Sequence, residues 1–121
     1  MDERKLLGDL GEDAVAAYLR RHCYHLLASQ YRCRFGEIDI IARSPEGILC
    51  FVEVKTRSSR SFAQAMDAVT PAKQRRMRTT AQFYLAQTGL DCPCRFDVAE
   101  VYPDKNGGWE RPEINYIEEA F

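Results

Sequence analysis

Apolar residues recur every three or four positions at the start of the chain, over residues 2–22. The stripe consists of Leu7, Leu10, Ala14, Val15, Tyr18 and Leu19. This spacing predicts an amphipathic helix that packs one face against a core. Asp2 and Glu3 suit its first turn, because the positive end of the helix dipole attracts acidic side chains.

After about residue 25 the pattern changes to short runs rich in apolar, β-branched and aromatic residues. Three strands are predicted, over residues 26–33, 37–42 and 48–56. The last two are separated by Ser44-Pro45-Glu46-Gly47, which contains turn-forming residues and no core residue. We therefore expect these two strands to form an antiparallel hairpin.

A second helix is predicted between Thr70 and Gly89. Thr70 is a suitable N-cap, Pro71 fits the first helical position, and Gly89 is a natural stop. A strand over residues 95–102, a loop over 103–112 and a short edge strand over 114–117 follow. The order is α-β-β-β-α-β with a further short strand, which favours an α/β fold with a mixed sheet flanked by helices. The length of 121 residues and the 45% apolar content fit one domain spanning residues 1–121.

Composition excludes several classes of protein. The mean hydropathy of -0.41 leaves no long apolar run to cross a bilayer, and the N-terminus lacks the pattern of a secretory signal. We therefore expect a cytoplasmic protein without a membrane partner. Five cysteines are expected to be reduced and mostly buried. Cys92-Pro93-Cys94 lacks zinc-knuckle spacing, so a metal or redox role for this pair is the weaker interpretation.

The charge is segregated along the chain, although the formal net charge is only -1. Residues 54–78 carry seven basic residues and one acidic residue, so the other 96 residues sum to -7. A solvated helix face and a surface for polyanions both fit this block, and its concentration in a mildly acidic chain is typical of the second. The seven candidate phosphate-binding residues are Lys55, Arg57, Arg60, Lys73, Arg75, Arg76 and Arg78.

Two carboxylates oppose each other in the predicted hairpin. Because its turn centres near Glu46, residues whose numbers sum to about 92 should pair, which places Asp39 opposite Glu53. Lys55 lies two residues further along, on the same face. Like charges at opposed positions are destabilising unless something positive lies between them.

The plain interpretation is a charged outer face that Lys55 neutralises. The neighbouring residues oppose it, because Ile41 and Phe51 alternate onto the carboxylate face and bury it in part. The other face is expected to hold Ile38, Ile40, Val52 and Val54. Two carboxylates and a lysine in such a place suit a hard divalent cation, Mg²⁺ first and Mn²⁺ second.

The string Gly36-Glu37-Ile38-Asp39, followed by Glu53-Val54-Lys55, resembles the Asp…Glu-x-Lys signature of the restriction-endonuclease-like nucleases. The branch it most resembles is the Holliday-junction-resolvase-like one. From about residue 4 to 118 the chain resembles the YraN-like family of small bacterial proteins, including a Gly-x-x-Gly-Glu-x-x-Ala motif from Gly8. This resemblance implies a restriction-endonuclease-like α-β-β-β-α-β core, Asp39 and Glu53 as metal ligands, Lys55 in a catalytic role and Glu12 as a further catalytic carboxylate and metal ligand.

Glu12 lies away from the centre of the apolar stripe, so without the resemblance it is a solvated helix residue. Gly8 lies one turn earlier on the same flank, where the missing side chain is expected to let the helix approach the sheet edge. With the resemblance, we expect Glu12 to reach the site.

The favoured function is a Mg²⁺-dependent endonuclease that cuts DNA, branched or junction DNA in particular. Lys55 would hold the nucleophile or help to deprotonate it, and the basic block would grip backbone phosphates. Symmetric junction cleavage would require a homodimer. A nucleic-acid-binding or repair-accessory protein that keeps the fold is the alternative, and a protein-interaction module is a third class.

Overall fold

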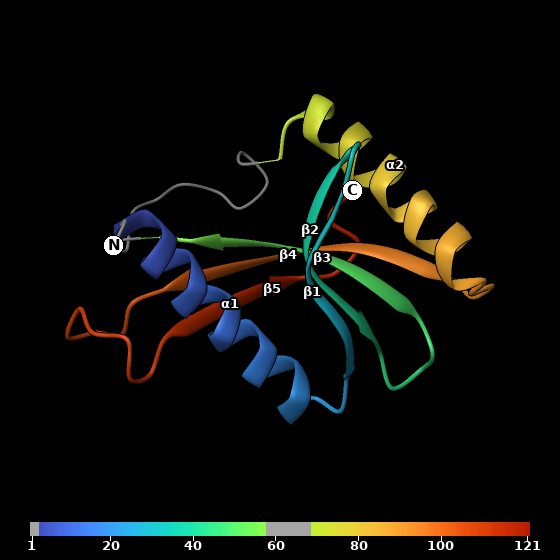
Figure 1. Ribbon diagram of the computed structural model, residues 1–121. Helices are drawn as coiled ribbons and strands as arrows, with labels where there is room; N and C mark the ends of the chain where they lie inside the picture. Colours follow the sequence, from blue (N-terminus) through green and yellow to red (C-terminus); the bar gives the residue numbers. More distant parts are fainter. Residues whose placement is uncertain (1–2, 58–68) are drawn as a thin grey trace.

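The computed structural model describes residues 3–57 and 69–121, which form a five-stranded mixed sheet with a helix on each face (Figure 1). The elements are α1 (Glu3–Arg21), β1 (His25–Cys33), β2 (Gly36–Arg43), β3 (Leu49–Thr56), α2 (Pro71–Thr88), β4 (Cys94–Tyr102) and β5 (Glu113–Ile117). The sheet order follows the chain, with β3 and β4 parallel and the other neighbours antiparallel. The element order expected from the sequence is confirmed, the short last strand included.

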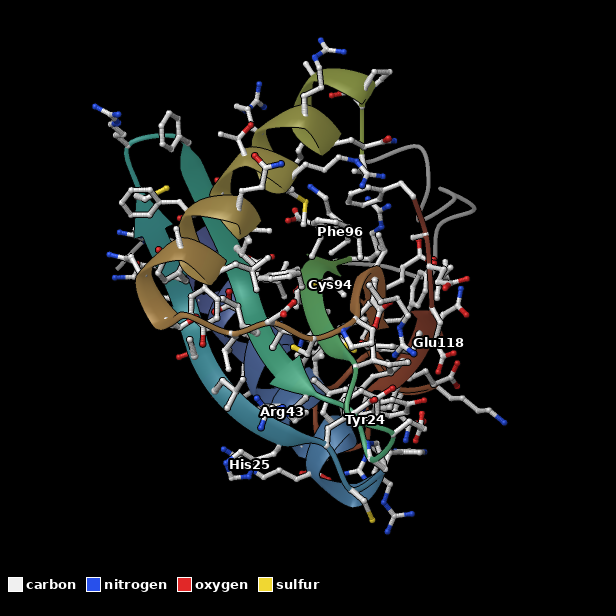
Figure 2. The ribbon with its side chains drawn as sticks, turned by 90° about the vertical axis from the view of Figure 1, so that its right-hand side faces the viewer. Tyr24, His25, Arg43, Cys94, Phe96 and Glu118 are labelled. Atoms are coloured by element: carbon white, nitrogen blue, oxygen red, sulfur yellow. The ribbon has the colours of Figure 1, made fainter. Side chains whose placement is uncertain are left out.

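The two faces of the sheet carry separate cores. On one face Val15 and Leu19 of α1 pack with Ile40 and Val52, together with other buried residues of β2, β3 and β4. On the other face the core is formed by Ile41, Leu49 and Phe51 of the sheet with Ala81 and Tyr84 of α2. Phe96, labelled in Figure 2, packs against this second core from β4. Each inner strand is therefore covered on both sides.

The crossover from β3 to the parallel strand β4 contains α2, as a parallel pair requires. The Thr70 side chain caps the helix by accepting a 3.2 Å hydrogen bond from the Lys73 backbone N–H, and Pro71 follows it. Gly89 ends the helix in the left-handed conformation, with φ 70°. The predicted start and stop are both confirmed. The first turn of α2 thereby places Lys73 beside Glu53 of β3.

The close contact between α1 and the sheet is made at Gly11, and the expectation that Gly8 serves this purpose is wrong. Among residues 3–57 and 69–121, nothing outside the helix lies within 4 Å of a Cβ built at Gly8, whereas one built at Gly11 would overlap the Thr56 side chain at the end of β3. Both glycines lie on the same helix, so the helical pattern alone does not distinguish them. Helix α1 therefore contacts the sheet at Gly11, the residue immediately before Glu12.

These two glycines provide a matched test of the packing. Gly11→Ala is expected to destabilise the fold by about 1–3 kcal/mol, because the added methyl group overpacks a filled contact. Gly8→Ala should raise stability by about 0.5–1 kcal/mol through helix propensity alone. Urea unfolding of both variants measures the difference. Equal effects of the two substitutions would contradict this packing.

The cysteines are all free, as expected, but only Cys50 is buried; Cys23 and Cys94 are exposed. The prediction that most of them are buried is therefore wrong. Cys23 lies just past the end of α1, and Cys94 is the first residue of β4, at the rim of the sheet. No helix within residues 3–57 and 69–121 is long and apolar enough to span a membrane.

Candidate active site

The predicted hairpin register is present between β2 and β3. Ile40 pairs with Val52 and Ile41 with Phe51, so the residue numbers sum to 92. The ladder ends at the Ile40–Val52 pair, and Asp39 and Glu53 are the next residues beyond it. Asp39 Oδ2 accepts a 2.7 Å hydrogen bond from the Val54 backbone N–H. The Asp39 side chain thus ties β2 to β3 where the backbone ladder stops.

The two-residue alternation of β2 fails around Asp39. Ile38 packs in the core beneath α2 with Ile41 and Phe51, although the sequence places it on the same face as Ile40. On its other side β2 pairs with β1 in one register from Ile41 to Gly36, but within this stretch no pair forms between Asp39 and Gln30. Gln30 has a left-handed φ of 50°, which is uncommon for a residue with a side chain. This local distortion is the physical reason that the Ile38 prediction is wrong.

Glu53 is buried, with 5% of its surface exposed, and it faces two lysines. The Lys73 ammonium group, from the first turn of α2, donates a hydrogen bond to Glu53 Oε1. Lys55 Nζ lies 3.6 Å from the same oxygen, so Lys55 and Glu53 share a face of β3 as predicted. From the sequence, the predicted role of Lys73 is phosphate binding alone. Its pairing with Glu53 depends on the placement of α2 over β3.

The charges in this cluster shift the pKa values of its members. Burial raises the pKa of Asp39 to about 7, and the negative charge of Glu53 adds to the effect, while the Val54 N–H opposes it. Burial, together with the positive charge of Lys73, lowers the pKa of Lys55. Burial also acts to lower the pKa of Lys73. The hydrogen bond from Lys73 to Glu53 outweighs this effect, so the pKa of Lys73 is raised.

The raised pKa of Asp39 predicts a pH-dependent stability. Its pKa in the fold lies above the ordinary value of 3.8, so the stability that the neutral acid contributes is present at low pH and lost as pH rises through about 7. A tenfold change in proton affinity corresponds to about 1.4 kcal/mol. Between pH 5 and pH 8 the free energy of unfolding of the wild type is therefore expected to fall by on the order of a few kcal/mol. Asp39→Asn cannot ionise and should lose less stability between pH 5 and pH 8.

Thermal and urea unfolding of both proteins at pH 5 and pH 8 measures this difference. Asp13→Asn, which removes an exposed carboxylate of α1, is the control and should follow the wild type. Parallel curves for the wild type and Asp39→Asn would contradict the assigned burial of Asp39.

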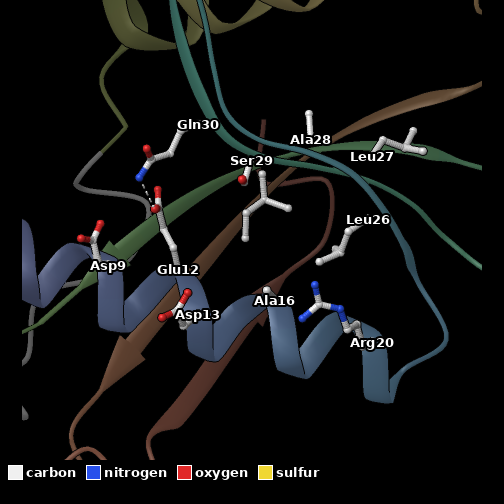
Figure 3. A pocket seen from close by; sticks show the side chains of 11 residues that line it. Asp9, Glu12, Asp13, Ala16, Arg20, Leu26, Leu27, Ala28, Ser29 and Gln30 are labelled. Carbon is white, nitrogen blue, oxygen red and sulfur yellow. Dashed lines mark hydrogen bonds between the residues drawn. The ribbon is translucent and has the colours of Figure 1, made fainter.

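Glu12 reaches toward the cluster from α1. Its Oε2 accepts a 2.8 Å hydrogen bond from Gln30 Nε2, which is drawn in Figure 3. Its negative charge is one of those that raise the pKa of Asp39. Glu12 also lines a pocket of about 740 Å³ between α1 and β1, together with Asp9, Asp13 and Arg20. No sequence pattern indicated Gln30, because its contact with Glu12 depends on its unusual backbone conformation.

Oxygen ligands for a hard cation are thus present, but no compact set of three is preformed. Within the described ranges, no three residues of the His, Cys, Asp and Glu types gather closely enough to hold a metal ion. Asp39 and Glu53 are the carboxylates at the end of the β2–β3 ladder. The Glu12 carboxylate accepts its hydrogen bond from Gln30. The role of Glu12 as a metal ligand stays a prediction.

The seven basic residues divide into groups. Lys55, Lys73 and Arg57 pair with buried carboxylates, Arg57 with Glu100 at 3.4 Å. Three arginines of α2 are exposed: Arg75, Arg76 and Arg78. The Arg78 guanidinium lies over the ring of Phe96, 4.8 Å from its centroid. Arg60 lies outside the described residues.

Comparison with known proteins places the chain in a family. The family model described as "Uncharacterised protein family UPF0102" matches residues 11–101. A UPF0102 protein of Symbiobacterium thermophilum is 46% identical over 116 residues, which are 95% of each chain. A UPF0102 protein of Cupriavidus necator is 45% identical over 121 residues, 100% of this chain and 86% of that protein. A third, of Cupriavidus taiwanensis, is 46% identical over 102 residues, 84% of this chain and 78% of that protein.

The matched range of the family model includes Glu12, Asp39, Glu53 and Lys55. The relatives cover most or all of the chain at 45–46% identity and are themselves UPF0102 proteins. The chain therefore belongs to the UPF0102 family, the YraN-like family expected from its motifs.

Proposed function

We propose that this protein is a metal-dependent phosphodiesterase that cuts DNA, with branched or junction DNA as its preferred substrate. The observation that carries the proposal is the convergence of Asp39, Glu53 and Lys55 where the β2–β3 ladder ends. A protein that only binds phosphate gains nothing from buried carboxylates, because they repel the phosphate. The resemblance to the resolvase-like nucleases supports the same chemistry.

The residues fit a hard divalent cation. Asp39 and Glu53 provide carboxylate oxygens. Burial is the main cause of the raised pKa of Asp39, and the negative charge of Glu53 adds to it, so the two charges disfavour each other. A cation shared between them would relieve this repulsion. Asp39 and Glu53 would hold Mg²⁺ or Mn²⁺, which when bound activates water and neutralises charge developing on the phosphate.

The lysines have separate roles in this proposal. Lys55 lies on the Glu53 face. As an ammonium group it can hold a water molecule against the phosphate, and as a neutral amine it can accept a proton from that water. Lys73 orients Glu53 from α2. The exposed arginines of α2 would bind backbone phosphates outside the reacting group.

The test is a cleavage assay on four DNA substrates of the same sequence: a four-way junction, a flap, a single strand and a linear duplex. Each is incubated with the full chain in Mg²⁺, Mn²⁺ or EDTA. Metal-dependent cutting of the junction or flap supports the proposal. No cutting of any substrate in either metal, by protein shown to be folded, would refute it.

A nucleic-acid-binding accessory protein is the second candidate, and one observation favours it. Lys55 and Lys73 both form ion pairs with Glu53 and offset its negative charge, as a purely structural cluster would. This candidate predicts DNA binding without cleavage in all the conditions above.

Both candidates require phosphate contacts by the basic block, and salt dependence measures these contacts. If about five of its seven residues touch the backbone, log affinity should fall against log salt with a slope of roughly -4 to -5. Fluorescence anisotropy on a labelled junction in EDTA, from 50 to 300 mM KCl, gives the slope. An affinity that barely changes with salt would mean that the block is only a solvated surface.

A further inference from the structure

A second, smaller pocket opens beside Glu53, between the start of β2 and the first two turns of α2. Its volume is about 250 Å³. It is lined by Gly36, Glu37, Glu53, Lys73, Arg76 and Met77. Glu53 and Lys73 belong to the candidate active site, so a ligand in this pocket would lie next to the reacting phosphate.

The tip of the β1–β2 hairpin forms one wall of this pocket and is fixed against α2. Gly36 has φ 150°, and a Cβ there would lie only 3.2 Å from Thr80 Oγ1, so glycine allows this close approach. One residue earlier, the Phe35 ring packs edge-on against Phe83 of α2, with 5.9 Å between centroids. The pocket wall is therefore held in place by packing at Phe35 and by the close approach at Gly36.

The lining of the pocket matches the parts of a nucleotide. The exposed Arg76 can bind a phosphate through its guanidinium group, while Lys73 stays paired with Glu53. Met77 is the apolar member of the lining, and only 2% of its surface is exposed. Glu37 carries a carboxylate that accepts hydrogen bonds from base amino groups; it pairs at 2.9 Å with Arg32, and both side chains are largely exposed.

The size of the pocket limits the ligand further. Pockets for drug-sized molecules are about 300–1,000 Å³, so this one suits a single planar group and excludes a stacked base pair. A base in continuous duplex would have to leave its stack to enter, whereas a base at a flap or at the centre of a junction is already free.

We infer that this pocket holds one unpaired nucleotide next to the phosphate that is cut, and that it thereby selects DNA with an unpaired nucleotide at that point. The inference rests on the proposed function, because it assigns the substrate of the same site. Arg76 is the specificity-determining residue, since it lines the pocket and leaves Lys73 free to remain on Glu53.

Binding in EDTA tests this inference without any cleavage. Two DNAs of equal length and charge are used, one with a single unpaired 2-aminopurine at a flap junction and one with 2-aminopurine paired within a duplex. The wild type should bind the flap more tightly and change its 2-aminopurine fluorescence. Arg76→Gln should lower the flap-to-duplex affinity ratio by about 10-fold and remove the fluorescence change.

Arg75→Gln is the matched control, because Arg75 is also exposed on α2 but does not line the pocket. It should weaken binding to both DNAs alike and keep both the ratio and the fluorescence change. The inference is overturned if the wild type does not prefer the flap, or if the two variants change the ratio equally. Cleavage in Mg²⁺ without flap preference would refute only the pocket, while flap preference without cleavage would refute only the phosphodiesterase.

Discussion

Asp39→Asn and Glu53→Gln are expected to lower metal-dependent DNA cleavage by about 10²-fold or more, a loss near 3 kcal/mol of transition-state stabilisation. Each change removes a carboxylate that would hold the metal ion. Each also removes a negative charge that repels phosphate, so DNA binding in EDTA should stay equal or improve. Lost cleavage with retained folding and binding is the result that the phosphodiesterase requires.

Lys55→Ala should lower cleavage to a similar extent, by about 10²-fold or more, if Lys55 positions the nucleophile or takes its proton. Glu46→Gln in the β2–β3 turn and Lys105→Ala in the loop before β5 are controls of matching charge. Both residues are exposed and lie outside the candidate site, so cleavage should be unchanged. Circular dichroism and urea unfolding establish that each variant is folded before its rate is compared.

Two outcomes would contradict this assignment in different ways. If the wild type cuts DNA and both carboxylate variants cut at the full rate, the activity belongs to another site or to a contaminant. If no substrate is cut, but Asp39→Asn and Glu53→Gln still change metal-dependent DNA binding, the accessory protein becomes the better account.

The hairpin that carries the site could be predicted because its information is local. The turn residues around Glu46 fix where the chain reverses, and the reversal fixes which residues oppose each other. The register of Ile40 with Val52 then follows from counting. The two ends of α2 could be predicted for the same reason. The N-cap Thr70, the first helical residue Pro71 and the C-cap Gly89 set the helix ends through the local backbone alone.

The surroundings of Asp39 and Glu53 could not be predicted, because they depend on contacts between distant segments. Ile38 packs beneath α2, Gln30 on the neighbouring strand has a left-handed backbone, and the Gln30 amide reaches Glu12; alternation in the sequence indicates none of these. Lys73 reaches Glu53 only because α2 crosses over the end of β3. Periodicity cannot supply either contact.

A buried ion pair within β4 was also beyond sequence analysis. Asp97 is fully buried in β4 and accepts hydrogen bonds from Arg95 at 2.9 and 3.1 Å, from the Tyr116 hydroxyl at 2.6 Å and from the Glu119 backbone N–H at 3.1 Å. Arg95 donates in turn to the Tyr24 hydroxyl at 2.8 Å. Arg95 also lies 3.6 Å from the exposed Glu118 carboxylate, and Tyr24 and Glu118 are both labelled in Figure 2. The pair thus joins β4 to β5 and to the start of β1.

Asp97→Ala is expected to destabilise the fold by about 3–5 kcal/mol, because the buried Arg95 charge loses its buried partner and keeps only the exposed Glu118 carboxylate, 3.6 Å away, among its ion pairs in the described residues. Arg32→Gln breaks the exposed pair with Glu37 and should cost less than about 1 kcal/mol. The double variant Arg95→Met/Asp97→Leu removes both buried charges and should recover part of the loss. Urea unfolding of the four proteins, wild type included, measures these differences. A loss in Asp97→Ala no larger than that in Arg32→Gln would show that the buried network does not stabilise the sheet.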